Sequence, residues 1–197
     1  MNNNAQNDII MYNYRRCIME LDRDRRVTKT KNAIRSSLLS LMAEKPHPSI
    51  SVSELCRRAD IGRGTFYLHY NDVYEVVEEI EEEILDYFRD SCFRYFDSEN
   101  QAGFQALVNN SLLWIKDNEE IFRTFLLDPG SDFSAKFLSY LVDLFYYHDI
   151  KYHPSRVNKS SKYKIVQTCS GYLGAVRNWV SDHFPVTCEE FAKLLIS

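Results

Sequence analysis

The chain has 197 residues, of which 45% are hydrophobic and 26% are charged, as in an ordinary globular protein with a substantial core. No run approaches the ~20 apolar residues of a membrane-spanning helix, and the N-terminus lacks the apolar segment of a secretory signal. With only six glycines and five prolines and few β-branched runs, we expect an all-α protein located in the cytoplasm.

Charge is distributed unevenly along the chain, although the formal net charge is only −4. Residues 1–70 contain 12 Lys and Arg against 7 Asp and Glu, whereas residues 71–197 contain 12 against 21. A basic N-terminal part on an acidic remainder confines any affinity for phosphate to one end of the molecule.

The first 24 residues are polar and mix arginines with acids. They predict either a poorly ordered tail or a basic arm that reaches along DNA. Val27 to Lys45 then has apolar residues at steps of three and four, which predicts an amphipathic helix that ends at Pro46. Near the start of this helix, Thr30 is a suitable hydrogen-bond donor to a phosphate.

Ser51 to Glu54 has the spacing of a capping box, which predicts that the next helix begins here. A capped helix N-terminus also presents backbone N–H groups to anions. Ser51 is therefore either a purely structural cap or also a ligand of phosphate, and the sequence leaves both interpretations open.

Residues 55–70 predict two short helices, the second from Arg63 to Tyr70, joined by a turn at residues 60–62. Leu55 and Ala59 share one face of the first helix, and Phe66 and Tyr70 share one face of the second. So tight a turn makes the helices cross steeply, which is the geometry of a helix-turn-helix. The outer face of the second helix has no acidic residue and suits phosphates and base edges. Its residues are Arg63, Gly64, Thr65, Tyr67 and His69.

The run from Ala59 to Tyr70 resembles the recognition-helix signature of the TetR/AcrR family of bacterial transcription regulators. That signature consists of a small residue, a turn, a basic residue, Gly-Thr-aromatic-Tyr and His-aromatic. The resemblance by motif extends over about residues 28–87. Four positions depart from it, since Asp60 replaces a turn glycine, Gly62 a capping serine, Leu68 an often basic residue and Val73 a phosphate-binding lysine.

The resemblance implies an all-α fold of about nine helices, with a three-helix helix-turn-helix head and a C-terminal helical bundle. It divides the chain into a flexible arm over residues 1–24, a DNA-binding domain over residues 25–71 and a ligand-sensing, dimerising domain over residues 72–197. A homodimer would bind a near-palindromic double-stranded operator and be released by an effector. The DNA-binding residues are expected to be Thr30, Ser51, Arg63, Gly64, Thr65, Tyr67 and His69.

Val73 to Phe96 predicts one long helix with six glutamates in its early turns. We interpret these acids as a solvated face; a metal site is the alternative, which the lack of an accompanying histidine disfavours. In the family that the chain resembles, this helix joins the head to the body and is the lever for signalling. Further helical patterns follow at residues 104–116, 119–127, 133–147, 161–183 and 187–196, with a polar loop over residues 148–160.

The C-terminal part is rich in aromatic residues on helical stripes. Most of them must pack in a core, but a bundle lined by aromatic rings can also hold a small apolar or cationic molecule. The resemblance implies such an effector pocket. The residues expected to line it are Phe88, Phe104, Trp114, Phe122, Phe125, Phe137 and Tyr172.

Two glycines lie inside the predicted helix over residues 161–183, where a glycine destabilises the helix by about 1 kcal/mol. Close approach of another helix explains such a pair, either within one subunit or across a dimer. The resemblance implies a two-fold dimer built from the last two long helices. The residues expected at its seam are Gly171, Gly174, Trp179, Phe191 and Leu195.

Enzymatic chemistry finds little support in the sequence. The Gly62-Arg63-Gly64 segment has no preceding strand and is not a dinucleotide loop, and no Ser or Cys lies in a nucleophile-elbow context. The five cysteines are widely spaced, which predicts separate buried thiols and neither a disulfide nor a zinc framework. We therefore expect no enzyme, no cofactor and no metal.

The preferred hypothesis is a TetR-type DNA-binding repressor. The departures at Asp60, Gly62 and Val73 keep a second hypothesis open. In it, the fold serves as an interaction module or co-activator that binds a partner protein.

Overall fold

The computed structural model describes residues 24–98, 101–128 and 131–196, and within these ranges it contains helices and no β-strand. They are the helix over residues 24–42, η1 (His47–Ser49), α2 (Val52–Arg58), α3 (Arg63–Tyr67), α4 (Val73–Ser98), α5 (Gln101–Asp117), α6 (Glu119–Leu127), α7 (Phe133–Tyr152), η2 (Pro154–Arg156), α8 (Ser161–Ser181) and α9 (Cys188–Ile196). The predicted all-α fold of about nine α-helices is confirmed. The predicted arm over residues 1–24 lies, except for residue 24, outside the described residues.

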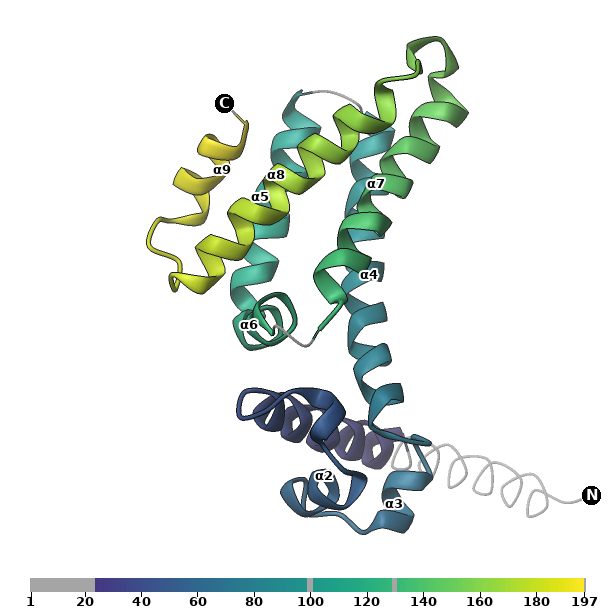
Figure 1. Cartoon of the computed structure of the whole chain (residues 1–197), viewed down its shortest axis with the longest axis vertical. Helices are drawn as coiled ribbons and strands as arrows, with labels where there is room; N and C mark the ends of the chain where they lie inside the picture. The colour runs from purple at the N-terminus through teal and green to yellow at the C-terminus, as the bar shows by residue number, and fades with distance from the viewer. Residues whose placement is uncertain (1–23, 99–100, 129–130, 197) are drawn as a thin grey trace, which may run out of the picture.

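Helix α4 runs between two groups of helices that lie at its opposite ends (Figure 1). The helix over residues 24–42, α2 and α3 gather at its N-terminal end, and we call residues 24–72 the head. Helices α5–α9 gather around its C-terminal half, and we call residues 84–196 the body. The 26 residues of α4 extend over about 39 Å at 1.5 Å per residue, so one continuous helix links the two. Within the described ranges, no helix combines the length and apolarity needed to cross a lipid bilayer.

The head packs around the apolar side chains that the sequence placed on one face of each helix. Ile34, Leu38 and Leu41, together with Leu55 of α2 and Phe66 of α3, are at most 1% exposed. Burying a side chain of this size stabilises the fold by about 1.5–3 kcal/mol. This cluster therefore holds α2 and α3 against each other and against the first helix.

The turn between α2 and α3 depends on one residue in the left-handed backbone region. Asp60 has a φ of 52°, a conformation that glycine, asparagine and aspartate adopt with the least strain. The Ile61 N–H donates to the Cys56 carbonyl at 3.0 Å, which closes the C-terminus of α2 in a Schellman arrangement. Aspartate can thus replace the glycine usual at this turn, because the turn requires the positive φ and not glycine itself.

We expect Asp60→Gly to leave the free energy of unfolding unchanged or to raise it by up to about 1 kcal/mol, because glycine adopts this φ without steric strain. Asp60→Val is expected to lower it by about 1–2 kcal/mol, since a β-branched residue is strained there. Urea denaturation of both variants measures the difference. Equal stability of the two variants would show that the turn does not depend on this φ.

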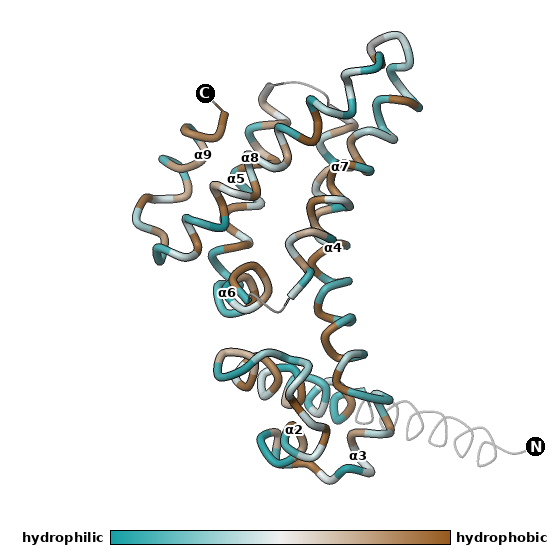
Figure 2. Tube along the Cα trace, viewed as in Figure 1, coloured by the Kyte–Doolittle hydropathy of each residue, from teal (hydrophilic) through white to brown (hydrophobic). Residues whose placement is uncertain are grey.

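The body packs around aromatic rings contributed by several helices. Phe122, Phe125 and Phe133 are fully buried, and the ring centroids of Phe88 and Phe137 lie 4.7 Å apart across α4 and α7. Along α4, short hydrophobic and hydrophilic runs alternate, as expected for a helix with one buried side (Figure 2). Aromatic residues of the C-terminal part therefore form much of the core of the body.

The end of α7 is where the helices depart most from the sequence-based expectation. The predicted helix ended at Tyr147, but α7 continues to Tyr152. His148 is buried, and its ring stacks on that of Phe96 of α4 with centroids 3.8 Å apart, so packing holds these polar residues in the helix. Pro154 then ends it, because proline disfavours helical backbone at the preceding residue. Near the other end of the chain, α3 is shorter than predicted and ends at Tyr67.

Candidate nucleic-acid interface and effector cavity

Ser51 caps the N-terminus of α2. Its Oγ accepts a hydrogen bond from the Glu54 backbone N–H at 3.3 Å, as the capping-box spacing predicts. The Glu54 carboxylate binds Lys45 Nζ at 2.6 Å instead of returning to Ser51, and this hydrogen bond holds the pKa of Glu54 below its ordinary value. Ser51 is exposed, so its structural role is compatible with contact to a phosphate.

The outer face of α3 and the segment just after it present most of the residues that the sequence assigned to DNA. Arg63 and Gly64 are exposed, while Thr65 and His69 are partly exposed. A Cβ added to Gly64 would meet no atom within 4 Å, so another molecule can approach the backbone closely here. The guanidinium of Arg63 donates to the Ser53 hydroxyl of α2, and this surface hydrogen bond leaves its remaining N–H groups available.

Two large side chains at the C-terminal end of α3, those of its last residue and of the C-cap residue after it, also reach outward. Tyr67 is 58% exposed and Leu68 is 80% exposed. Sequence reasoning assigned Tyr67 to DNA and treated Leu68 only as a departure from the family pattern. The structure therefore adds an apolar element to a face that is otherwise polar and basic.

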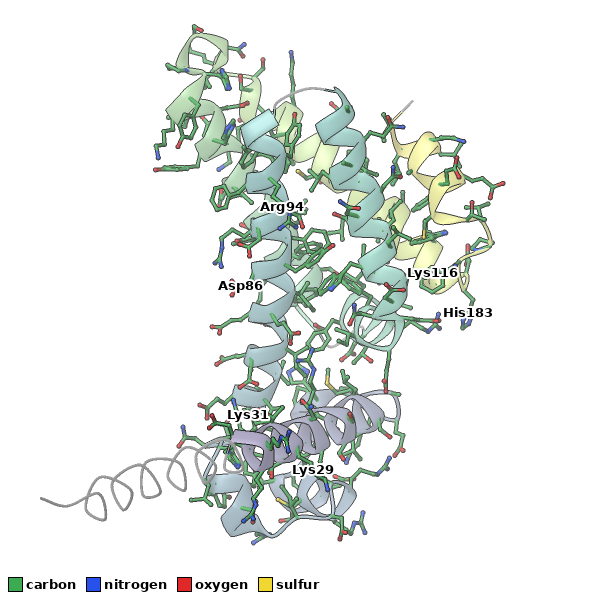
Figure 3. All side chains as sticks on the ribbon, turned by 180° about the vertical axis from the view of Figure 1, so that it is seen from behind. Lys29, Lys31, Asp86, Arg94, Lys116 and His183 are labelled. Atoms are coloured by element: carbon green, nitrogen blue, oxygen red, sulfur yellow. The ribbon has the colours of Figure 1, made fainter. Side chains whose placement is uncertain are left out.

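The helix over residues 24–42 contributes less to this face than its sequence suggests. The Thr30 hydroxyl donates to the Arg26 carbonyl of its own helix at 2.9 Å. Lys29 is exposed, whereas Lys31 lies where this helix meets α4 (Figure 3). Only part of the basic charge counted in the sequence is therefore directed away from the protein.

Three contacts fasten the head to α4. Lys31 Nζ forms an ion pair with Glu79 at 2.6 Å and lies 5.0 Å from the centre of the Tyr70 ring. The Tyr70 hydroxyl donates to the second carboxylate oxygen of Glu79 at 3.1 Å. Arg35 forms an ion pair with Glu83, one turn farther along α4. We call these five residues the head–α4 clamp.

The glutamates of α4 are thus more than the solvated face that the sequence predicted. Besides Glu79 and Glu83, Glu75 accepts a hydrogen bond from the Asn71 backbone N–H at 2.6 Å. Buried Glu81 pairs with Lys136 of α7 at 3.2 Å. The remaining two glutamates, Glu78 and Glu82, are exposed and fit the description of a solvated face. In the part of the chain that the structure describes, no three His, Cys, Asp or Glu residues are grouped to hold a metal ion.

We expect the Tyr70 hydroxyl in the clamp to make the free energy of unfolding fall at high pH. Burial, reinforced by the Glu79 carboxylate, raises the pKa of the Tyr70 hydroxyl above its ordinary value of about 10. The folded chain keeps this proton where the unfolded chain releases it, so the contribution of Tyr70 is fully present below about pH 10 and falls above it. We expect Tyr70→Phe to lower the free energy of unfolding by about 1 kcal/mol at pH 8. At pH 11 the deficit should shrink by about 1 kcal/mol.

Urea denaturation at the two pH values measures this difference, and Tyr67→Phe is the matched control because Tyr67 is exposed. A deficit that is the same at pH 8 and pH 11 would contradict the role assigned to the Tyr70 proton.

A cavity of about 280 Å³ lies between α4, α5, α7, α8 and α9. Of the seven aromatic residues expected to line a pocket, four do so: Phe88, Phe104, Phe137 and Tyr172. The expectation fails for Trp114, whose ring stacks on Tyr87 with centroids 3.9 Å apart, and for Phe122 and Phe125, which are buried in the core. A helical stripe of aromatics does not by itself tell a cavity wall from a filled core.

Sequence reasoning missed two thiols and one charged side chain of the cavity wall, those of Cys92, Cys169 and Lys164. Burial raises the pKa of Cys92 to about 12 and that of Cys169 to about 11, so both are protonated at neutral pH. Four-residue steps link Phe88 to Cys92 on α4 and Lys164 to Thr168 on α8, so the sequence shows that each pair shares one helix face. The sequence does not show which of these faces borders a cavity.

No protein-family model matches the chain. Solved structures do match it. The TetR transcriptional regulator of Streptococcus agalactiae 2603V has a TM-score of 0.64 and 22% identity, over 90% of this chain and 97% of that one. SmeT, the repressor of the Stenotrophomonas maltophilia multidrug efflux pump SmeDEF, has a TM-score of 0.65 and 14% identity, over 85% of this chain and 88% of that one. The chain has the TetR fold.

Two further comparisons show that this fold does not by itself define a function. DhaS, an activator of a dihydroxyacetone kinase operon, has a TM-score of 0.58 and 17% identity, over 85% of this chain and 92% of that one. Over 56 residues the chain is 38% identical to YxbF of Bacillus subtilis (strain 168), an uncharacterised HTH-type transcriptional regulator. That match covers 28% of this chain and only 15% of the relative's length. The likeness to the solved structures establishes the fold, and function needs its own argument.

The TetR fold leaves the glycines of α8 open to the outside. Gly171 and Gly174 are exposed, and a Cβ added to either would meet no atom within 4 Å. Packing inside the subunit, one of the two explanations that the sequence left open, therefore does not account for them. Trp179 and Phe191, expected at the same seam, are instead 3% and 8% exposed and stack on each other, which holds α9 against α8. Leu195 borders the cavity.

Proposed function

We propose that the chain is a cytoplasmic transcriptional regulator that binds double-stranded operator DNA as a homodimer. Residues 25–71 would form the DNA-binding domain, residues 72–197 the ligand-sensing and dimerising domain, and residues 1–24 an arm. The observation that carries the proposal is the exposed, acid-free outer face of α3, held on a buried three-helix core and clamped to α4. Such a face can enter a major groove, where base edges are read.

The site residues have different roles in this proposal. Arg63, Gly64 and Thr65 approach bases or phosphates, while Tyr67 and His69 position the DNA backbone. Thr30 and Ser51 bind phosphates on either side of the groove. Because the Thr30 hydroxyl already donates within its own helix, it serves phosphate only after rotating, and Ser51 is the stronger of these two assignments.

The dimer is proposed to form through the open side of α8, with α9 beside it. Gly171 and Gly174 leave room there for the backbone of a second helix, and the neighbouring Ser170 and Asn178 are also exposed. A two-fold dimer would place the two recognition helices in successive major grooves, about 34–36 Å apart. An operator for such a dimer is near-palindromic.

The cavity and the clamp share α4. Phe88 and Cys92 line the cavity, and Glu79 and Glu83 hold the head about one to four turns away along the same helix. Val73, the first residue of α4 after the head, is about 22 Å from Phe88 along the helix, so a tilt of about 10° moves the head by about 4 Å. An effector would act by binding one spacing of the two heads more tightly than the other, and release of DNA would relieve repression.

A second candidate is an interaction module or co-activator that binds a partner protein. The exposed Tyr67 and Leu68 favour it, because apolar side chains on a recognition helix suit a protein surface. The sign of regulation is also open to test, since SmeT is named a repressor and DhaS an activator.

A salt-dependent titration of the chain with DNA from immediately upstream of its own gene tests the proposal, with an unrelated duplex of equal length as competitor. Tight binding that survives the competitor and weakens steeply with salt supports a specific DNA reader. Equal, weak binding to both duplexes, together with co-purification of a protein, would favour the interaction module.

A further inference from the structure

The most exposed residues of the cavity wall lie together near the N-terminus of α8. Among the described residues that line it, only Lys164 and Thr168 are exposed, and both belong to the first two turns of α8. The deep part of the wall is apolar and buried and includes Phe88, Leu112 and Phe137. The wall is therefore mostly apolar, and we call its exposed edge at Lys164 and Thr168 the mouth.

The charge at this mouth is that of the Lys164 ammonium group. Among the described residues of the wall, Lys164 is the one that carries a charge, and none is an Asp or Glu. No ion pair of the described residues involves Lys164, whereas its neighbour Lys162 lies 3.9 Å from Asp143. A cation near Lys164 would meet an ammonium group and, among the described residues of the wall, no acid, which favours the apolar over the cationic effector that the aromatic sequence suggested.

Lys164 and Thr168 are spaced to bind one group together. They lie four residues apart on α8, so their side chains are neighbours on one face of the helix. An ammonium and a hydroxyl both donate hydrogen bonds, and a carboxylate accepts several. Tyr172, the next residue at this spacing, is already engaged, because its hydroxyl donates to the Leu195 carbonyl at 2.8 Å.

The volume limits the size of the occupant. The cavity has a volume of about 280 Å³. This is the small end of the range for ligand sites.

We infer that the cavity binds a small monocarboxylate with an apolar chain or ring of about this size. Its carboxylate lies at the mouth between Lys164 and Thr168, and its apolar part lies against Phe88, Leu112 and Phe137. This deepens the proposed function, since such a molecule would be the effector, but the binding itself requires no DNA.

The test is calorimetric titration of the full chain, without DNA, with octanoate, 1-octanol and octylammonium as probes. Octanoate is expected to bind about tenfold more tightly than octanol, and octylammonium more weakly than either. Lys164→Gln should remove the preference by weakening octanoate about tenfold while leaving octanol unchanged. Thr168→Val should weaken octanoate by a smaller factor.

Lys162→Gln is the matched control, because Lys162 lies on the same helix and outside the cavity wall, and it should leave all three affinities unchanged. The inference is overturned if octanol binds as tightly as octanoate, if none of the probes binds, or if both glutamine variants behave alike. Octanoate binding with the expected preference but without effect on operator binding would uphold the ligand class and remove only its role as effector.

Discussion

Replacing Arg63 by alanine is expected to weaken operator binding about 30-fold or more while leaving folding and dimerisation intact. An arginine contact to a base or phosphate is worth about 1–3 kcal/mol, and a dimer carries two copies. The side chain is exposed, and its hydrogen bond to Ser53 lies on the surface, so little stability depends on it. Titration of labelled operator measures the loss, and sedimentation measures the assembly state.

Arg89→Ala is the matched control for this prediction, because Arg89 lies in the body and pairs with Asp86 at 2.8 Å. It should change operator affinity by less than about twofold, since a surface ion pair contributes little. Loss of the dimer in Arg63→Ala, or equal loss of affinity in both variants, would contradict the assignment of Arg63 to DNA.

Replacing Gly174 by leucine is expected to abolish the dimer and, with it, tight operator binding. The subunit itself gains, because leucine is favoured over glycine in a helix interior by about 0.8 kcal/mol and the added side chain meets open space. Any damage must therefore arise between subunits. Sedimentation should show the single chain of 23.2 kDa. Urea denaturation should show that the free energy of unfolding of the subunit is equal to or above that of the wild-type subunit.

Gln105→Leu introduces the same side chain at an exposed position of α5 and should leave the dimer unchanged. A Gly174→Leu variant that still dimerises would show that the open side of α8 is not the seam. Such a result would also leave the two glycines without an explanation in the described structure.

The head was largely predictable because its determinants are local. Leu55, Phe66 and Tyr70 occupy the buried positions that their spacing indicated, and the turn depends on the backbone of Asp60 alone. Likewise Pro154 marked the true end of α7, although the polar residues before it suggested a loop. Local chemistry of this kind can be read within a few residues of sequence.

The clamp was not predictable, because its partners are distant in sequence. Lys31 and Glu79 are 48 residues apart. The sequence of a helix with six glutamates does not reveal which of them pairs with a lysine or arginine. The cavity was predictable in part, since Phe88 and Tyr172 line it, but Trp114 fills space beside Tyr87 instead. Filled and hollow parts of a core share the same hydrophobic period, so only the packing distinguishes them.

The placement of the cysteines gives each end of the molecule its own chemical reporter of opening. Cys56 is buried in the head, and Cys92 and Cys169 are buried in the body. Burial raises the pKa of all three thiols, and the thiolate is the reactive form, so a thiol reagent modifies each only when its surroundings open. The labelling rate of Cys56 thus measures fluctuations of the head, and the rates of the other two measure those of the cavity wall. A molecule held in the cavity slows the second process directly, and α4, which lines the cavity and pairs with the head, connects it to the first.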